Sequence, residues 1–217
     1  DIPPVNDSMA DLLVNRASLN FNWSEISPTI FGAVFESTLN PETRRSGGMH
    51  YTSIENIHKV IGPLFMDSLK QEFDDVKDMP KGKQRAAKLK QFQDKLASLT
   101  FFDPACGSGN FLTETYISLR RLENEVIKEL YSTRNLDLFD NPIKVSIHQF
   151  YGIEINDFAV TVATTALWIS ESQMIAETER IISQDIDFLP LKSYANIHEG
   201  NSLTTDWETI VPKDKLS

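Results

Sequence analysis

The chain has 217 residues and a formal net charge of −10, from 21 Lys and Arg against 31 Asp and Glu. With 41% hydrophobic and 24% charged residues it has the composition of an ordinary globular protein, which excludes a disordered or fibrous chain. No apolar run approaches the roughly 18 residues of a membrane span, so no membrane association is expected. The acidic balance argues against strong nucleic-acid binding by these residues alone. The single cysteine excludes an internal disulfide framework, and a reducing cytoplasm is the expected location.

The first part of the chain carries two predicted helices. Ser27-Pro28 indicates an N-cap followed by proline at the first helical position, and helical apolar spacing continues to Leu39. Thr52 and Glu55 form a capping-box pattern that opens a second helix with a clear apolar face. Gly62-Pro63 is expected to break that helix, and a short further helix is expected to follow.

A charged stretch separates these helices from the next one. Residues 71–84 are rich in charge and contain Pro80 and Gly82, which is typical of a linker. Apolar residues at helical spacing then predict an amphipathic helix over residues 85–99. The sequence therefore predicts a mostly helical N-terminal region over residues 1–98.

The pattern changes to alternating strands and helices in the second half. Short buried strands are predicted over residues 99–102, 149–153 and 194–198. Long helices are predicted over residues 111–131 and 158–176, the latter capped by Asp157. A strand–helix–strand–helix–strand order implies a parallel sheet with right-handed crossovers. The sequence thus predicts an α/β unit over residues 99–217.

The most specific motif is Asp103-Pro-Ala-Cys-Gly-Ser-Gly-Asn-Phe111, between the first strand and the next helix. Open parallel sheets bind ligands at the carboxyl ends of their strands, and glycines there let the backbone approach a ligand closely. Glu154 ends the second strand, where a carboxylate can accept hydrogen bonds from two ribose hydroxyls. Asn201 follows the third strand, where its amide can face an adenine edge. Together these strand ends describe an adenosine site, although a tight turn without a ligand is the simpler alternative.

The spacing of the glycines narrows the choice of cofactor. A dinucleotide fingerprint needs G-x-G-x-x-G, but Leu112 stands where the third glycine belongs. The same fingerprint expects an acidic residue about 20 positions after the glycines, whereas Glu154 is more than twice as far from Gly109 in the sequence. A phosphate-binding P-loop needs Gly-Lys-Ser/Thr, whereas Asn110 and Phe111 follow the glycine here. Because the acidic Asp103 suits a cationic ligand without a pyrophosphate, S-adenosylmethionine is the expected cofactor.

The motif resembles motif I of the amino-methyltransferases that act on adenine in DNA. Its spelling is particularly like that of type I modification subunits and single-chain type IIG restriction–modification enzymes. The stretch over residues 31–53 and the long segment between the first two strands favour the type IIG group.

Three further segments resemble motifs of the same family, in family order. Gly48-Met-His50-Tyr51-Thr52-Ser53 resembles motif X, which in the family lies against the methionine end of the cofactor. Tyr151-Gly-Ile-Glu154-Ile155-Asn156 resembles motif II, whose acid holds the ribose and whose next apolar side chain packs on adenine. Glu199-Gly-Asn201-Ser202-Leu203 resembles motif III, whose Asp or Asn meets the adenine amine.

The resemblance implies a truncated Rossmann-like class I methyltransferase core and a set of cofactor-binding residues. The implied residues are His50, Tyr51, Thr52, Asp103, Pro104, Ala105, Cys106, Gly107, Gly109, Asn110, Phe111, Glu154, Ile155, Asn201 and Ser202. No metal site is expected. No catalytic residue is expected in this chain either, because the family's motif IV needs Pro-Pro after motif III and none occurs beyond Pro3-Pro4.

The expected function is therefore that of the cofactor-binding portion of a site-specific DNA adenine-N6 methyltransferase in a restriction–modification system. The chain alone is expected to be inactive, and double-stranded DNA would be bound through parts outside it. A methyltransferase acting on RNA or on a protein amide, and a non-catalytic adenosine-binding module, remain alternatives. A nicotinamide oxidoreductase is disfavoured by the glycine spacing. Since the first strand would lack its usual neighbour, self-association through an exposed sheet edge is also expected.

Overall fold

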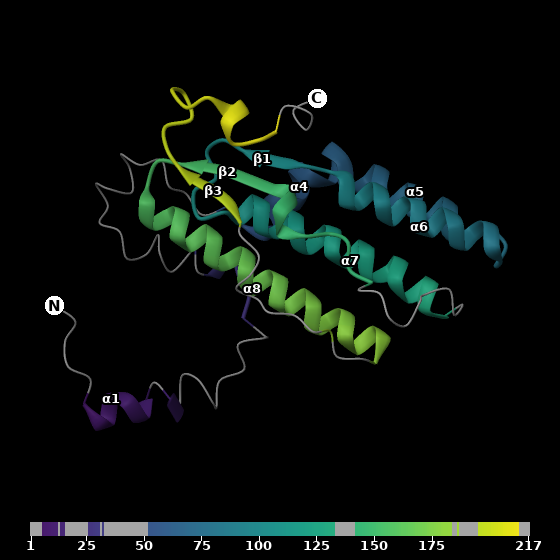
Figure 1. Cartoon of the computed structure of the whole chain (residues 1–217), viewed down its shortest axis with the longest axis horizontal. Coiled ribbons are helices and arrows are strands. Elements are labelled where there is room, and N and C mark those ends of the chain that lie inside the picture. Colours follow the sequence, from purple (N-terminus) through teal and green to yellow (C-terminus); the bar gives the residue numbers. More distant parts are fainter. Residues whose placement is uncertain are drawn as a thin grey trace.

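The computed structural model describes residues 6–12, 14–15, 26–30, 32, 52–132, 142–183, 186 and 195–212. A short helix, α1 (Asp7–Asp11), begins at the capping side chain of Asn6. Most of the helix predicted after Pro28 lies outside the described residues, and so do His50 and Tyr51 of the predicted motif X. Figure 1 shows the arrangement of the elements.

Residues 54–77 form an uninterrupted run of helix. It consists of α4 (Ile54–Ile61), a π-helical turn η3 (Gly62–Met66) and α5 (Asp67–Lys77). The predicted break at Gly62-Pro63 is therefore wrong. In an α-helix proline lacks the N–H for a backbone hydrogen bond, and its ring collides with the carbonyl one turn earlier. A wider π-helical turn at this point allows the helix to continue through Pro63. The cap also differs from the prediction, because Ser53 rather than Thr52 accepts the bond, from Asn56 N at 3.4 Å.

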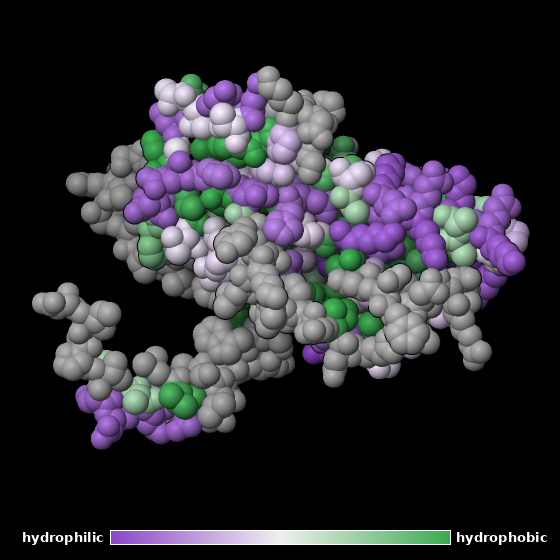
Figure 2. Space-filling model, in the orientation of Figure 1, coloured by the Kyte–Doolittle hydropathy of each residue, from purple (hydrophilic) through white to green (hydrophobic). Residues whose placement is uncertain are grey.

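The predicted linker over residues 71–84 is mostly helical as well. Only residues 78–82 connect α5 to α6 (Lys83–Ser98), and the two helices contact one another. The rings of Phe73 and Phe92 pack with their centroids 6.0 Å apart, and Lys95 pairs with Glu72. Burial of the apolar side chains between α5 and α6 stabilises both helices. The charge of this stretch alone had suggested a linker. Figure 2 shows hydrophilic side chains covering much of this helix pair on the visible face.

Three parallel strands form the sheet, as the sequence predicted. They are β1 (Phe101–Asp103), β2 (Phe150–Glu154) and β3 (Asn196–Glu199), in the order β1-β2-β3. A short 3₁₀ turn, η4 (Ile147–Gln149), leads into β2, and another, η6 (Trp207–Thr209), follows β3. In register, Asp103 lies opposite Gly152 and Glu154 lies opposite Glu199, so the carboxyl ends of the strands share one edge.

Two long helices connect the strands. They are α7 (Asn110–Ser132) and α8 (Asp157–Ile182), which run side by side beneath the sheet in the view of Figure 1. Asn156 caps α8 by accepting from Ala159 N at 2.9 Å, and the predicted cap Asp157 is instead the first helical residue. The ring of Phe150 joins the sheet to α7 through an edge contact with Tyr116, at 5.5 Å between centroids.

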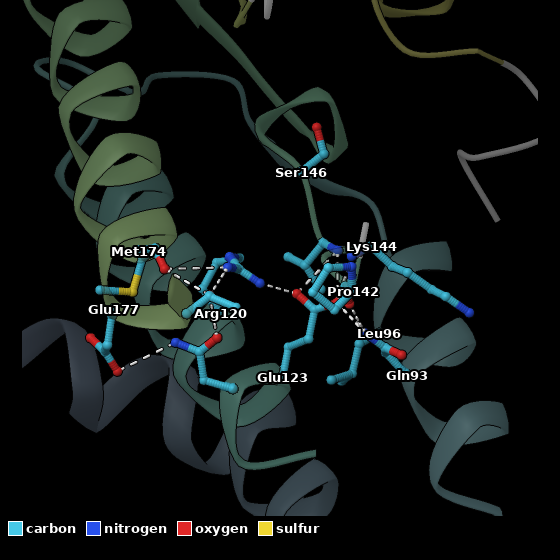
Figure 3. Close-up of polar contacts among 12 residues, drawn as sticks. Gln93, Leu96, Arg120, Glu123, Pro142, Lys144, Ser146, Met174 and Glu177 are labelled. Carbon is cyan, nitrogen blue, oxygen red and sulfur yellow. Dashed lines mark hydrogen bonds and ion pairs between the residues drawn. The ribbon is translucent and has the colours of Figure 1, made fainter. Parts of the chain in front are cut away.

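A buried polar network ties α6, α7 and α8 together (Figure 3). Arg120 and Glu123 form an ion pair with both side chains fully buried. Glu123 Oε1 also accepts from Gln93 Nε2 at 2.8 Å and from Lys144 N at 2.7 Å. Arg120 donates to Thr178 Oγ1 on α8 at 2.7 Å. A buried ion pair of this kind needs such extra partners to offset the loss of hydration. The network therefore fixes the positions of α6, α7 and α8 relative to one another.

The helices of the predicted N-terminal region pack against the sheet unit. The rings of Phe65 and Phe101 lie 5.1 Å apart, and Arg85 on α6 pairs with Glu129 on α7. The predicted division at residue 98 remains a prediction. Among the described residues, no helix is long and apolar enough to cross a membrane.

Candidate cofactor site

The turn between β1 and α7, residues 103–110, is here called the 103–110 loop. Asp103 Oδ1 accepts from Ala105 N at 3.0 Å, which folds the backbone back immediately after the strand. Gly109 N then donates to Cys106 O at 2.8 Å, and α7 begins at Asn110. Gly107 and Gly109 have φ values of 56° and 77°, in the left-handed region that favours glycine.

The two glycines meet different surroundings. A Cβ on Gly109 would lie 2.8 Å from the Cβ of Ala163, so α8 packs directly against this part of the loop. A Cβ on Gly107 would meet nothing within 4 Å. Gly107 is therefore required for its backbone conformation, and the space beside it is open. The loop is held from one side and free on the other.

Glu154 at the end of β2 holds the strand ends together. Its side chain is buried, and Oε2 accepts from Gly107 N at 2.9 Å while Oε1 accepts from Asn156 N at 3.0 Å. Its backbone carbonyl accepts from Gly200 N at 2.9 Å, just after β3. Each carboxylate oxygen has a second acceptor position. The group is thus fixed in place while retaining the capacity to accept two more hydrogen bonds.

Two acidic groups make this edge electronegative. Burial raises the pKa of Asp103, the hydrogen bond from Ala105 N lowers it, and the charge of Glu154 raises it further. Burial and the same two carboxylates raise the pKa of the Cys106 thiol, which keeps it protonated. Cys106 is buried against β2, since a Cβ on Gly152 would lie 2.8 Å from its sulfur. The cysteine is a packing residue, and the electronegative edge favours a cationic ligand.

The turn after β3 completes the edge. Asn201 is exposed, and its Oδ1 accepts from Leu203 N at 3.0 Å. The indole of Trp207 donates to Ser202 O at 2.8 Å and packs edge-on against Phe102, with centroids 5.1 Å apart. This contact fastens the turn after β3 to the first strand, across the width of the sheet.

Apolar side chains lie exposed beside these polar groups. Ile155 is 64% exposed, Phe158 is 56% exposed and Leu203 is 91% exposed. Large apolar side chains at the rim of a site supply a surface on which a planar ring can pack. Their positions directly after β2, in the first turn of α8 and after β3 place them at the same edge as Glu154.

The structure brings most of the predicted site residues to one edge of the sheet. The 103–110 loop with Phe111, the Glu154-Ile155 pair and the Asn201-Ser202 turn all adjoin the carboxyl ends of the strands. Thr52 lies directly before Ser53, the N-cap of α4, and is not part of these strand-end segments. Sequence reasoning did not single out Gly152, Trp207 or Ser108. Gly152 carried a readable signal, because glycine inside a strand marks close approach of another group.

The fold defines the class of protein: three parallel strands of a Rossmann-like methyltransferase core, with mostly helical elements before it. Residues 79–217, more than half of the chain, match the family model described as "MmeI, DNA-methyltransferase domain". The chain belongs to this family.

Individual relatives agree with that assignment. The chain is 42% identical over 192 residues to DNA methyltransferase A of Bacillus subtilis, covering 88% of this chain and 21% of that protein. It is 26% identical over 200 residues to a putative type II restriction enzyme and methyltransferase of Methanocaldococcus jannaschii, covering 82% of this chain and 16% of that protein.

A solved structure is similar as well. The type IIL restriction–modification enzyme MmeI, determined in complex with DNA, matches with a TM-score of 0.83 and 40% sequence identity. The match covers 97% of this chain and 27% of that one. The chain therefore spans less than a third of each of these three proteins.

Proposed function

We propose that this chain is the cofactor-binding part of a DNA adenine-N6 methyltransferase of a restriction–modification system, and that it binds S-adenosylmethionine at the carboxyl ends of β1, β2 and β3. The observation that carries the proposal is the buried Glu154 carboxylate. It is held under the Gly107 N–H beside the exposed side chain of Ile155.

The residues present fit this cofactor. Glu154 has two acceptor positions left for the ribose hydroxyls, and Ile155 offers an apolar face to adenine. We assign the adenine edge to Asn201, whose side chain is exposed in the turn after β3. Asp103, in an acidic environment, suits the cationic methionine end, and Gly107 leaves open space beside the loop. When bound, the cofactor supplies a methyl group that its positively charged sulfur activates for transfer.

The proposed substrate is an adenine amine in double-stranded DNA, bound through parts outside these residues. Membership of the DNA-methyltransferase family and the DNA complex of the relative MmeI support DNA as the substrate, and the resemblance of residues 103–111 to motif I of the adenine amino-methyltransferases supports adenine. The protein lowers the barrier to such a transfer mainly by holding the methyl donor and the accepting amine in line. The target base must leave the duplex for its amine to be reached. We also propose a cytoplasmic location, and self-association through the side of β1 to which no strand of the described residues is hydrogen-bonded.

Cofactor binding is tested by calorimetric titration of the full-length protein with S-adenosylmethionine and, separately, with NAD. We expect binding of S-adenosylmethionine alone. Glu154→Ala removes the ribose acceptors and unties Gly107, so it should weaken binding by at least about tenfold, which corresponds to 1.4 kcal/mol. The control Glu125→Ala removes a carboxylate whose side chain is half exposed on α7, and it should leave affinity unchanged.

Failure of the wild-type protein to bind S-adenosylmethionine would overturn the proposal, and binding of NAD would favour an oxidoreductase. The substrate is tested by incubating the full-length protein with the labelled cofactor and duplex DNA, RNA or protein. Mass spectrometry of the digested DNA should then show N6-methyladenine. Label in RNA or protein, or cofactor binding without turnover on any substrate, would support the alternatives stated above.

A further inference from the structure

Gly32 lies against the 103–110 loop although it is far from that loop in sequence. The residue is helical and buried. A Cβ built on it would collide with Ser108 Oγ, and it would lie 2.9 Å from Asn110 Oδ1 and 3.0 Å from Ser108 Cβ. The two side-chain oxygens can rotate away from the new Cβ, but Ser108 Cβ cannot, so a side chain at position 32 requires a shift of the loop by a few tenths of an ångström.

The segment before Gly32 is fixed to the rest of the protein. Gln173 Nε2 on α8 donates to Ile26 O at 2.7 Å. The turn that follows is closed by Ile30 N donating to Ser27 O at 2.9 Å, and Thr29 is 1% exposed. The segment that leads to Gly32 is thus held on α8, the helix that also packs on Gly109.

We propose that Gly32 is a positioning residue for the cofactor, acting through Ser108 and Asn110. Its backbone supports the start of α7 and the turn that carries Gly107 N to Glu154. A side chain at position 32 would push Ser108 and Asn110, and with them Gly107, away from the ribose-binding carboxylate. The expected effect is on cofactor binding, because Ser108 and Asn110 belong to the same turn as Gly107, which donates to Glu154.

This inference rests on the proposed binding of S-adenosylmethionine. In the full-length protein we expect Gly32→Ala to weaken the affinity for S-adenosylmethionine about tenfold in calorimetry. In methylation assays the KM for S-adenosylmethionine should rise while kcat changes little. Gly82→Ala is the matched control, because a Cβ there meets nothing within 4 Å, and it should leave both quantities unchanged.

A rescue variant tests the contact itself. Ser108→Gly removes both atoms of Ser108 that the new Cβ meets. Adding Gly32→Ala to the Ser108→Gly variant should therefore weaken the affinity for S-adenosylmethionine much less than adding it to the wild-type protein. Such non-additivity is expected only for residues in contact. An unchanged affinity in Gly32→Ala, or the absence of rescue, would overturn the inference. A lower melting temperature with unchanged affinity and KM would do the same, since it would show a purely structural role.

A second variant covers the case in which Gly32→Ala does not fold. Gln173→Ala frees the Ile26 carbonyl without adding atoms near the loop, and we expect a two- to fivefold loss of affinity. Full affinity in this variant would count against the inference. Failure of the wild-type protein to bind S-adenosylmethionine would instead contradict the proposed function. Wild-type binding with normal binding by Gly32→Ala and Gln173→Ala would contradict only the role of Gly32.

Discussion

At the scale of single residues, the site combines two carboxylates whose surroundings differ. Both oxygens of Glu154 accept backbone N–H bonds, whereas Asp103 accepts one and lies partly buried near the charge of Glu154. The pKa of Asp103 is raised chiefly by burial. Groups with raised or lowered pKa values cluster at functional sites, because a site built for a charged ligand tolerates repulsion in the ligand's absence.

Asp103→Asn tests that arrangement. Asparagine keeps the oxygen that accepts from Ala105 N but removes the charge. Because the pKa of Asp103 is raised on folding, the folded state binds its proton more tightly, and this group's contribution to stability falls as pH rises above about 4. The variant should therefore have a higher free energy of unfolding than the wild-type protein at pH 7. It should also lose affinity for S-adenosylmethionine.

Urea unfolding at pH 7 and at pH 4 measures the first effect, and the gain should shrink at the lower pH. Calorimetry measures the second. A variant that is less stable at pH 7 would show that the Asp103 charge is favourable in the folded protein. A more stable variant with unchanged affinity would show that Asp103 does not contact the cofactor's cationic end.

At the scale of elements, one buried ion pair on α7 connects this helix to α6 and α8. Arg120 and Glu123 are one turn apart on α7, and their outer bonds reach α6, α8 and the segment before β2. Sequence reasoning assigned this stretch to a long helix but gave no reason to place an arginine in the core. Partners on neighbouring segments make that burial tolerable: Thr178 accepts from Arg120, and Gln93 and the Lys144 N–H donate to Glu123.

Arg120→Ala should be severely destabilising. It leaves the Glu123 carboxylate buried without its charge partner, a change that typically costs about 3–5 kcal/mol. The adjacent Arg121→Ala is the control, since Arg121 is exposed on the same helix and its loss should cost under about 0.5 kcal/mol. Guanidinium unfolding of both variants measures the difference. Equal stability of the two variants would mean that the buried pair contributes little.

Helix boundaries show the same dependence on packing. The charges over residues 71–84 and the proline at position 63 both pointed to interruption, yet helix continues through most of these positions. Buried apolar residues on α5 and α6 supply stabilisation that local propensity does not contain. Local rules succeeded where the local interaction decides the outcome, as at the glycine turn after β1.

At the scale of the whole molecule, the sheet formed by the described residues is unpaired on one side of β1. β1 pairs with β2, and in the described part of the chain no strand is hydrogen-bonded to the other side of β1. Unpaired strand edges present N–H and carbonyl groups that another chain can bind. This property belongs to the arrangement of strands and not to any single residue.

Self-association follows as a prediction for residues 1–217 expressed alone. Light scattering coupled to gel filtration should give a mass above the monomer value of 24.6 kDa, decreasing on dilution. The same measurement on the full-length protein is the comparison, and a monomer there would indicate that residues outside 1–217 cover this edge. A concentration-independent monomer of 24.6 kDa with a sharp unfolding transition at high temperature would contradict the prediction.

The sequence by itself determined the parallel α/β order, the glycine turn after the first strand and the acid at the end of the second. Each of these is encoded by neighbouring residues, through apolar periodicity, turn chemistry or the end of a strand. Tertiary structure alone decided that Gly32 lies against Ser108, that Trp207 fastens the last turn to Phe102, and that Arg120 is buried. These contacts join residues far apart in the chain, and their formation depends on the packing of whole elements, which no local pattern specifies.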